Sequence, residues 1–280
     1  MDVLISQKTE RIIQNFIGDG IEKICVLSDF DKTLTKAFVD GRDSGSLIST
    51  LYNHGYLSEE YQKIAQEMYA YYSVIEKDET LPLKERQSAM QERWVKHKQL
   101  LIKEGLTKQD IYDAMQSDNV QLREGYQDFF TLLSENTIPL IILSAGWLGT
   151  LSIERYLKKN HWNYDNIHLI GNDFIWDDSG KAIGFKEPII HSLNKSAVVL
   201  ESSSVFSEMK KRRNVILLGD HLNDVQMIEG FEYENLLKIW FLNKDVEQNL
   251  KRYQEVYDMV IMNDWGLPVV NEILEKIFER

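Results

Sequence analysis

Two aspartates, Asp29 and Asp31, stand directly after the apolar run Ile24–Leu27. Carboxylates two residues apart at the end of a strand can point into the same cleft. One could attack a phosphorus atom while the other passes a proton to the leaving oxygen. Because an ionised aspartate and a phosphate repel each other, such a site needs a divalent cation, and Mg²⁺ suits all-oxygen ligands. D-x-D is also a common surface pattern, so the pair alone does not establish catalysis.

Three further polar clusters have the residue types that this chemistry requires. Ser144–Gly146 offers a hydroxyl and backbone N–H groups that suit a phosphate oxygen, although it could be only a strand-to-helix turn. Asp220 and Asp224 could complete a metal site, or Asp220 could cap a following helix. Lys195 could supply a cation near the carboxylates, although a lone lysine is usually a solvated surface charge.

Short apolar runs separated by polar turns and helical patterns position these clusters. Runs of this length without alternation are typical of parallel strands buried on both faces, and we therefore predict a doubly wound, mostly parallel α/β sheet. Ligands of such sheets bind at the carboxyl ends of the strands. A hairpin is predicted over 173–185, with Asp178–Gly180 at its tip. The predicted strands are Ile24–Leu27, Pro139–Leu143, Ile167–Ile170, Val215–Leu218, Leu237–Leu242 and Met259–Met262.

Between Leu34 and Tyr126 the short apolar runs are absent, and the sequence shows helical periodicity instead. One helix is expected after Ser58, which can cap it, a second after Pro82, and a third from Thr107. We therefore predict a helical cap over 38–119, inserted after the first strand and its turn. The α/β catalytic core then comprises residues 1–37 and 120–280.

The composition limits the class of protein. Of the residues, 43% are hydrophobic and 27% charged, and the formal net charge is −12, which would repel a nucleic acid polymer. A small phosphorylated substrate remains possible where a cation and local donors reverse the field. The apolar runs are too short to span a membrane, and the single cysteine, Cys25, fits a core position in a reducing compartment. We therefore predict a cytoplasmic protein and expect it to be a monomer.

The order of these clusters and the motif D-F-D-x-T-L-T resemble those of the haloacid dehalogenase superfamily of phosphohydrolases. From about residue 20 onward the chain more specifically resembles the cytosolic pyrimidine 5′-nucleotidase (type III) family. The segments that carry this likeness are 25–34, 122–126, 138–146, 184–195, 214–220 and 237–243.

The resemblance implies a role for each matching residue. Asp29 matches the nucleophile that becomes an aspartyl-phosphate, and Asp31 the general acid/base. Asp29, the backbone carbonyl of Asp31, and Asp220 would hold Mg²⁺, with Asp224 in support. Positions matching those that hold substrate are Ser144, Ala145 and Lys195 for the phosphate and Glu76 for the nucleobase.

Some positions depart from the family's pattern. His221 and Asn223 replace a serine and a glycine beside the metal carboxylates, which should leave the metal chemistry intact. His97 stands where the family has a substrate-contacting serine. It either alters substrate selection or is a partly buried histidine beside Trp94. Trp147 could line the pocket or simply pack.

The leading prediction is Mg²⁺-dependent hydrolysis of pyrimidine nucleoside 5′-monophosphates to nucleoside and phosphate, through an aspartyl-phosphate. Alternatives are a nucleotidase for purine or modified monophosphates, such as 7-methylguanosine monophosphate, and a nucleoside phosphotransferase. An alternative of another class is a nucleotide-binding protein that keeps the fold without turnover. Two aspartates in the nucleophile loop argue against this last class, since a binder does not need them.

Overall fold

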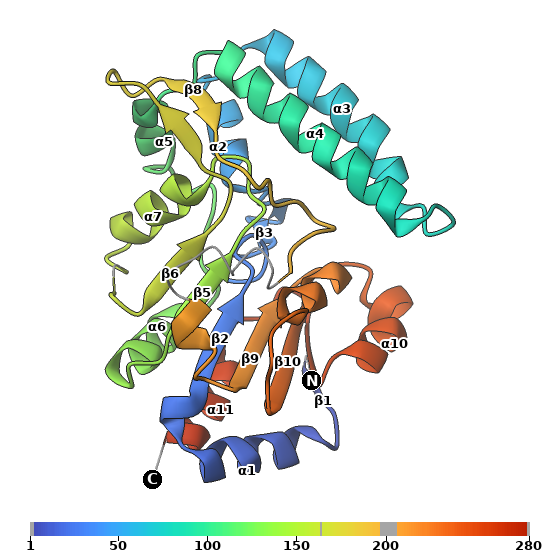
Figure 1. Ribbon diagram of the computed structural model, residues 1–280, viewed down its shortest axis with the longest axis vertical. Coiled ribbons are helices and arrows are strands. Elements are labelled where there is room, and N and C mark those ends of the chain that lie inside the picture. Colours follow the sequence, from blue (N-terminus) through green and yellow to red (C-terminus); the bar gives the residue numbers. More distant parts are fainter. Residues whose placement is uncertain (1–2, 163, 197–205, 279–280) are drawn as a thin grey trace.

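The computed structural model describes residues 3–162, 164–196 and 206–278. Its centre is a seven-stranded sheet in the order β1-β11-β10-β9-β2-β5-β6, in which β1 is antiparallel and the other strands run parallel (Figure 1). The predicted mostly parallel sheet is confirmed, but Ile24–Ser28 is the second strand along the chain rather than the first. The strands are β1 (Val3–Ile5), β2 (Ile24–Ser28), β5 (Leu140–Leu143), β6 (Ile167–Ile170), β9 (Asn214–Gly219), β10 (Asn235–Leu242) and β11 (Met259–Met262).

Strand β2 shows why the apolar runs lack alternation. All five of its residues are buried. Ile24 and Val26 pack in one apolar cluster, whereas Cys25 and Leu27 pack in another. Both faces of the sheet are therefore covered, as expected for parallel strands. Cys25 is a core residue, and its burial raises the pKa of the thiol to about 12.

Helices of the core cover both faces of this sheet (Figure 1). Helix α1 packs against β10 and α11, and α11 also contacts α6. The core helices are α1 (Thr9–Asp19), α6 (Tyr126–Glu135), α7 (Thr150–Lys159), α9 (Phe206–Met209), α10 (Val246–Val256) and α11 (Pro268–Phe278). Two 3₁₀ turns, η1 (Ile21–Lys23) and η2 (Leu222–Ile228), precede β2 and follow β9.

The segment between β2 and α6 is mainly helical, as predicted. It contains the short strands β3 (Phe38–Val39) and β4 (Arg42–Asp43), and the helices α2 (Leu47–Asn53), α3 (Glu59–Lys77), α4 (Leu83–Lys103) and α5 (Lys108–Ala114). The Ser58 hydroxyl caps α3 by accepting from the Tyr61 N–H at 3.0 Å, and Thr107 and Asp110 form a capping box at α5. The helices α3 and α4 lie side by side at the end of the molecule toward which β2 points (Figure 1).

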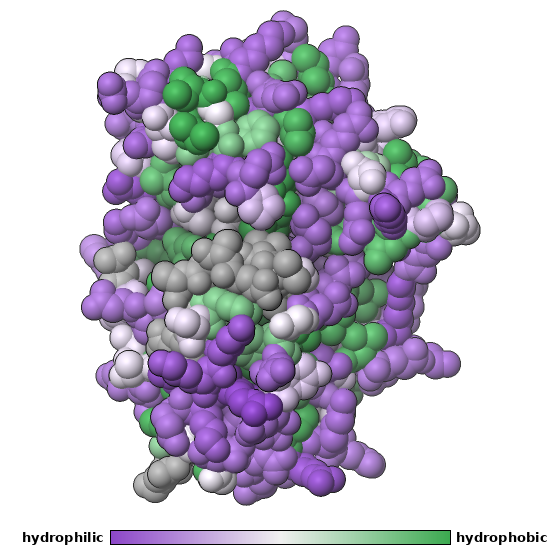
Figure 2. All heavy atoms as spheres, viewed as in Figure 1, coloured by the Kyte–Doolittle hydropathy of each residue, from purple (hydrophilic) through white to green (hydrophobic). Residues whose placement is uncertain are grey.

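The predicted hairpin is confirmed as β7 (Phe174–Trp176) paired with β8 (Ala182–Phe185), and β8 contacts α4. Figure 2 shows mostly hydrophilic residues on one face, with the described apolar residues in small separate groups. Among the residues placed by the structure, no helix is long and apolar enough to cross a membrane.

Candidate active site

The ends of strands β2 and β9 bring the first carboxylates together. These strands are parallel neighbours, with Ser28 opposite Leu218, and the Asp29 N–H donates to the Leu218 carbonyl at 3.1 Å. Gly219 makes the turn after β9 possible. A Cβ atom there would lie 2.5 Å from the Trp240 ring and 2.8 Å from the Asp224 Cβ, so any other residue would displace the turn that carries Asp220.

Three carboxylates and one ammonium group converge at this edge. Oxygen atoms of Asp29, Asp220 and Asp224 all lie within 4.8 Å of one another. The Lys195 ammonium donates to Asp29 Oδ1 and, at 3.0 Å, to Asp224 Oδ1. Asp224 Oδ2 accepts from the backbone N–H groups of Asp220 and His221, at 3.3 and 3.1 Å. Asp224 thus orients both the lysine and the turn.

Burial sets the charge of this cluster. It raises the pKa of Asp29 to about 6, although Lys195 opposes the shift. Burial, followed by the charges of Asp29 and Asp224, raises the pKa of Asp220 well above its usual range. Burial alone would lower the pKa of Lys195, but Asp224 and Asp29 hold it above its ordinary value. The ammonium therefore stays charged between two carboxylates that repel each other.

The Asp31 carboxyl lies apart from this cluster. Its Oδ1 is buried and has no hydrogen-bond partner within the described ranges. Burial and then the Asp29 charge raise its pKa to about 7. Its Oδ2 lies 3.7 Å from where a Cβ on Gly146 would stand, so Asp31 faces the Ser144–Gly146 turn. This is a carboxyl group that can hold or release a proton.

The Ser144–Gly146 turn follows β5 at the same edge of the sheet. The Ser144 hydroxyl is buried and accepts from the Gly146 N–H at 3.0 Å. The Ala145 carbonyl accepts from Trp94 Nε1 of α4 at 2.9 Å and from the Asn172 side chain at 3.3 Å. The turn is thus fixed from both the helical insert and the core. A fixed turn can present its hydroxyl and N–H groups to a phosphate oxygen without reordering.

The carboxylates fit a divalent cation. The charge of Asp224 raises the pKa of Asp29, and the charges of Asp29 and Asp224 raise the pKa of Asp220. A bound Mg²⁺ would relieve this repulsion, and all the available ligand atoms are oxygens. Asp29 and Asp220 would hold the ion. Asp31 could join them only through its backbone carbonyl, because its carboxylate is not part of the cluster.

The structure places Glu76, His97 and Trp147 where α3 and α4 face the core. The Glu76 carboxylate accepts from the Ser192 hydroxyl and from Arg93 Nη1, the latter at 3.4 Å. His97 is buried, hydrogen-bonds to the Tyr61 hydroxyl, and stacks on Trp147 at 4.1 Å between ring centroids. Trp147 therefore both packs and lines a hollow of the insert, together with His97.

Arg123 fixes the loop that carries Asp29 and Asp31. Its guanidinium donates to five oxygen acceptors and lies 4.2 Å from the Phe241 ring centroid. The acceptors are the carbonyls of Lys32, Thr33 and Trp265 and the side chains of Asn243 and Asp264. In the sequence, Arg123 stands out only as part of the segment 122–126 that resembles the family. The signal available for this role was a lone arginine that follows the apolar residues Val120 and Leu122 and precedes a helix.

Lys98 joins α4 to Asn172 and to Trp147, which follows the Ser144–Gly146 turn. Its fully buried ammonium donates to the carbonyls of Asn172 at 3.3 Å and Trp147 at 3.5 Å, and lies 3.9 Å from the Phe174 ring centroid. Burial lowers its pKa to about 7, opposed by Asp173.

We expect this lysine to make stability depend on pH. Its pKa is lower in the folded than in the unfolded chain, so unfolding takes up a proton between about pH 7 and 10, and stability falls as pH decreases through that window. We compare the free energy of unfolding of Lys98→Met with that of wild type. The difference should shift in favour of the variant by about 2 kcal/mol when the pH is lowered from 9.5 to 7.5. Urea unfolding at both pH values measures this. Lys96→Met, on the exposed side of the same helix, should show no such change, and equal behaviour of the two variants would contradict the assignment.

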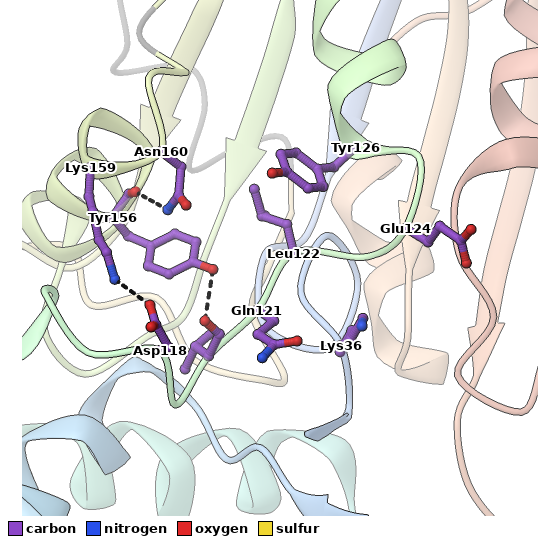
Figure 3. A pocket seen from close by; sticks show the side chains of 10 residues that line it. Lys36, Asp118, Gln121, Leu122, Glu124, Tyr126, Tyr156, Lys159 and Asn160 are labelled. Atoms are coloured by element: carbon purple, nitrogen blue, oxygen red, sulfur yellow. Dashed lines mark hydrogen bonds and ion pairs between the residues drawn. The ribbon is translucent and has the colours of Figure 1, made fainter. Parts of the chain in front are cut away.

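A second hollow, of about 470 Å³, lies near the base of the insert (Figure 3). Lys159 lines it but is paired with Asp118 at 2.8 Å, and Tyr156 donates to the Val120 carbonyl. None of the clustered carboxylates faces this space. It therefore offers no reactive group for the chemistry above.

Comparison with known proteins agrees with this geometry. Residues 32–278 match the family described as pyrimidine 5′-nucleotidase (UMPH-1). The chain is 36% identical to the human 7-methylguanosine phosphate-specific 5′-nucleotidase, over 95% of this chain and 89% of that one. It is 31% identical to a putative cytosolic 5′-nucleotidase 3 of Caenorhabditis elegans, over 95% and 72%. A structure of cytosolic 5′-nucleotidase IIIB bound to cytidine has a TM-score of 0.83 at 28% identity, covering 99% and 93%. A phosphoserine phosphatase shares the fold, with a TM-score of 0.54 at 17% identity over 89% and 97%.

The fold and the cluster of carboxylates at the edge of the sheet define a haloacid dehalogenase-type phosphohydrolase, that is, a phosphoric monoester hydrolase. Within this class the chain belongs to the pyrimidine 5′-nucleotidase family, as its sequence predicted. It is a 5′-nucleotidase that acts on small nucleotide substrates.

Proposed function

We propose that this chain hydrolyses nucleoside 5′-monophosphates in a Mg²⁺-dependent reaction through an aspartyl-phosphate on Asp29, with pyrimidine monophosphates as the leading substrates. The observation that carries the proposal is the convergence of Asp29, Asp220 and Asp224 within 4.8 Å, with Lys195 bridging two of them. A cytoplasmic location is part of the proposal and is supported by a relative named a cytosolic 5′-nucleotidase.

In the first half-reaction each side chain of the site has a separate role. The Asp29 carboxylate attacks phosphorus, and the bond from phosphorus to the 5′-oxygen breaks. The Asp31 carboxylic acid gives its proton to that oxygen, which leaves as the nucleoside hydroxyl. Lys195 and the Ser144–Gly146 turn hold the phosphate oxygens, and a bound Mg²⁺ would neutralise the negative charge that they and the carboxylates bring together.

The second half-reaction restores the site. The Asp31 carboxylate takes a proton from water, and the hydroxide oxygen attacks the phosphorus of the aspartyl-phosphate. The bond between phosphorus and Asp29 then breaks, releasing inorganic phosphate and the free carboxylate. The same Asp31 oxygen can serve as acid and then as base, because its Oδ1 is not committed to a partner among the described residues.

Residues 38–119 are proposed to be the cap that selects the substrate and excludes water. The cytidine bound to the similar 5′-nucleotidase IIIB and the family's description support a pyrimidine. A second candidate is 7-methylguanosine monophosphate, which is favoured by the names of several relatives, including those of rat and human.

A phosphate-release panel of CMP, UMP, GMP, 7-methylguanosine monophosphate and an aryl phosphate tests the proposal. We expect the nucleotides to be turned over with higher kcat/KM than the aryl phosphate, because the cap contributes binding only to the nucleoside part. Turnover of the aryl phosphate alone would contradict a nucleotide substrate.

Metal removal should abolish this activity reversibly. EDTA should eliminate phosphate release, and excess Mg²⁺ should restore it, because the clustered carboxylates and the phosphate otherwise repel one another. Ca²⁺ should restore it poorly, since its larger and looser coordination misplaces the phosphate. Full activity after dialysis against EDTA would refute the metal requirement.

A further inference from the structure

A hollow of about 440 Å³ lies between the helices of the insert and Trp147, within the size range of small-ligand sites. Trp147 also lines a narrow gap next to Asp31 and Ser144. The hollow therefore lies beside the end of the site that handles phosphate, where the nucleoside part of a nucleotide would extend. The inference below rests on the proposed function in this respect.

Arg93 brings a full positive charge to this hollow. It is buried, and its guanidinium carbon lies 5.3 Å from the ring centroid of Tyr69 and 5.4 Å from that of Trp147. It also lies 5.2 Å from the Trp94 centroid. Aromatic faces at such distances attract cations. In this chain an internal cation already occupies them.

The nearest carboxylate, that of Glu76, is also already paired. One oxygen of Glu76 faces Arg93 Nη1 at 3.4 Å, and the other accepts from the Ser192 hydroxyl. Glu76 does not line the hollow, and no other carboxylate does so within the described part of the chain. Burial, and then the neighbouring charge of Arg93, lower the pKa of His97 to about 3, so that histidine is neutral at pH 7. The charge on the described lining is therefore that of Arg93.

We propose that Arg93 is a specificity-determining residue that favours monophosphates of neutral bases and discriminates against the cationic base of 7-methylguanosine monophosphate. Guanine offers Arg93 the acceptor pair N7 and O6, and the pyrimidines offer exocyclic carbonyl oxygens. Methylation of N7 removes one acceptor and places a positive charge on the ring. Such a base loses a hydrogen bond and meets a like charge, while the aromatic faces and the carboxylate that would attract it are already occupied.

The kcat/KM values for GMP and 7-methylguanosine monophosphate test this assignment, because the two substrates differ by one methyl group and its charge. Wild type should prefer GMP by about tenfold or more, since a like charge at a buried site opposes the methylated base. Arg93→Gln should shift this ratio toward the methylated substrate by about ten- to a hundredfold, because Glu76 and the aromatic faces become available. Arg93→Lys keeps the charge and should keep the preference.

Two controls separate the charge of Arg93 from general effects. Arg86→Gln, on the same helix, removes a guanidinium that donates to the Glu76 carbonyl at 3.2 Å, and should leave the ratio unchanged. In Arg93→Gln/Glu76→Gln the gain for the methylated substrate should be smaller than in Arg93→Gln, because the carboxylate that attracts the base is gone, whereas the relief from the like charge remains.

Equal kcat/KM values for the two substrates in wild type would overturn the assignment, as would an unchanged ratio in a folded Arg93→Gln variant. Calorimetric binding of guanosine and 7-methylguanosine gives the same comparison without turnover. If no nucleotide releases phosphate, the proposed function fails. If the two nucleosides bind wild type with equal affinity, the role of Arg93 fails.

Discussion

Asp29→Asn should abolish phosphate release, by at least about 10⁴-fold in kcat, while the protein remains folded. The amide is nearly the same size as the carboxylate but cannot form an acyl-phosphate with the substrate. Lys195 keeps its second partner, Asp224, so the variant does not leave a buried ammonium without a counter-charge. Steady-state phosphate release and thermal unfolding, measured on the same preparation, distinguish lost chemistry from lost structure.

Asp178→Asn is the matched control, because Asp178 is exposed at the tip of the β7–β8 hairpin. It makes the same chemical change far from the carboxylates and should retain wild-type turnover. Incubation with labelled substrate and rapid acid quenching should trap a phosphorylated wild-type protein but no phosphorylated Asp29→Asn. Wild-type turnover by Asp29→Asn would remove Asp29 from the mechanism.

The set of side chains at the carboxyl edge of the sheet could be predicted from the sequence, because it depends on local patterns. Each continuous apolar run ends at a polar turn, and the carboxyl ends of parallel strands meet at one edge. The structure accordingly brings Asp29, Ser144 and Asp220 to that edge. The strand Val3–Ile5 was not predicted, since three residues at an antiparallel edge carry too little periodicity to be recognised.

Contacts between distant segments could not be predicted in this way. Arg123 gathers acceptors from 32–33, 243 and 264–265, and no spacing along the chain indicates which loops meet. Arg93 faces Glu76 only because α3 and α4 lie side by side, and the same glutamate could equally have faced solvent. The residue types indicate the reaction, whereas the charge of the hollow that we propose selects the base follows only from the packing of α3 and α4.

Asp31→Asn should lower the hydrolysis of nucleoside monophosphates by about 10²–10⁴-fold, which is the usual contribution of a general acid. A nucleoside alkoxide is a poor leaving group and needs the proton that Asp31 supplies. A nitrophenolate leaves readily without one. The first half-reaction with 4-nitrophenyl phosphate should therefore be impaired much less than that with CMP.

Rapid-mixing kinetics can separate the two half-reactions of this variant. Because asparagine cannot take a proton from water, the aspartyl-phosphate on Asp29 should persist, and nitrophenolate should appear as a burst followed by slow turnover. The amplitude of the burst should approach one equivalent per active site. An equal loss of the first-step rate with both substrates would show that Asp31 acts on the geometry of the nucleophile loop, through the contacts of Lys32 and Thr33 with Arg123, and not as the proton donor.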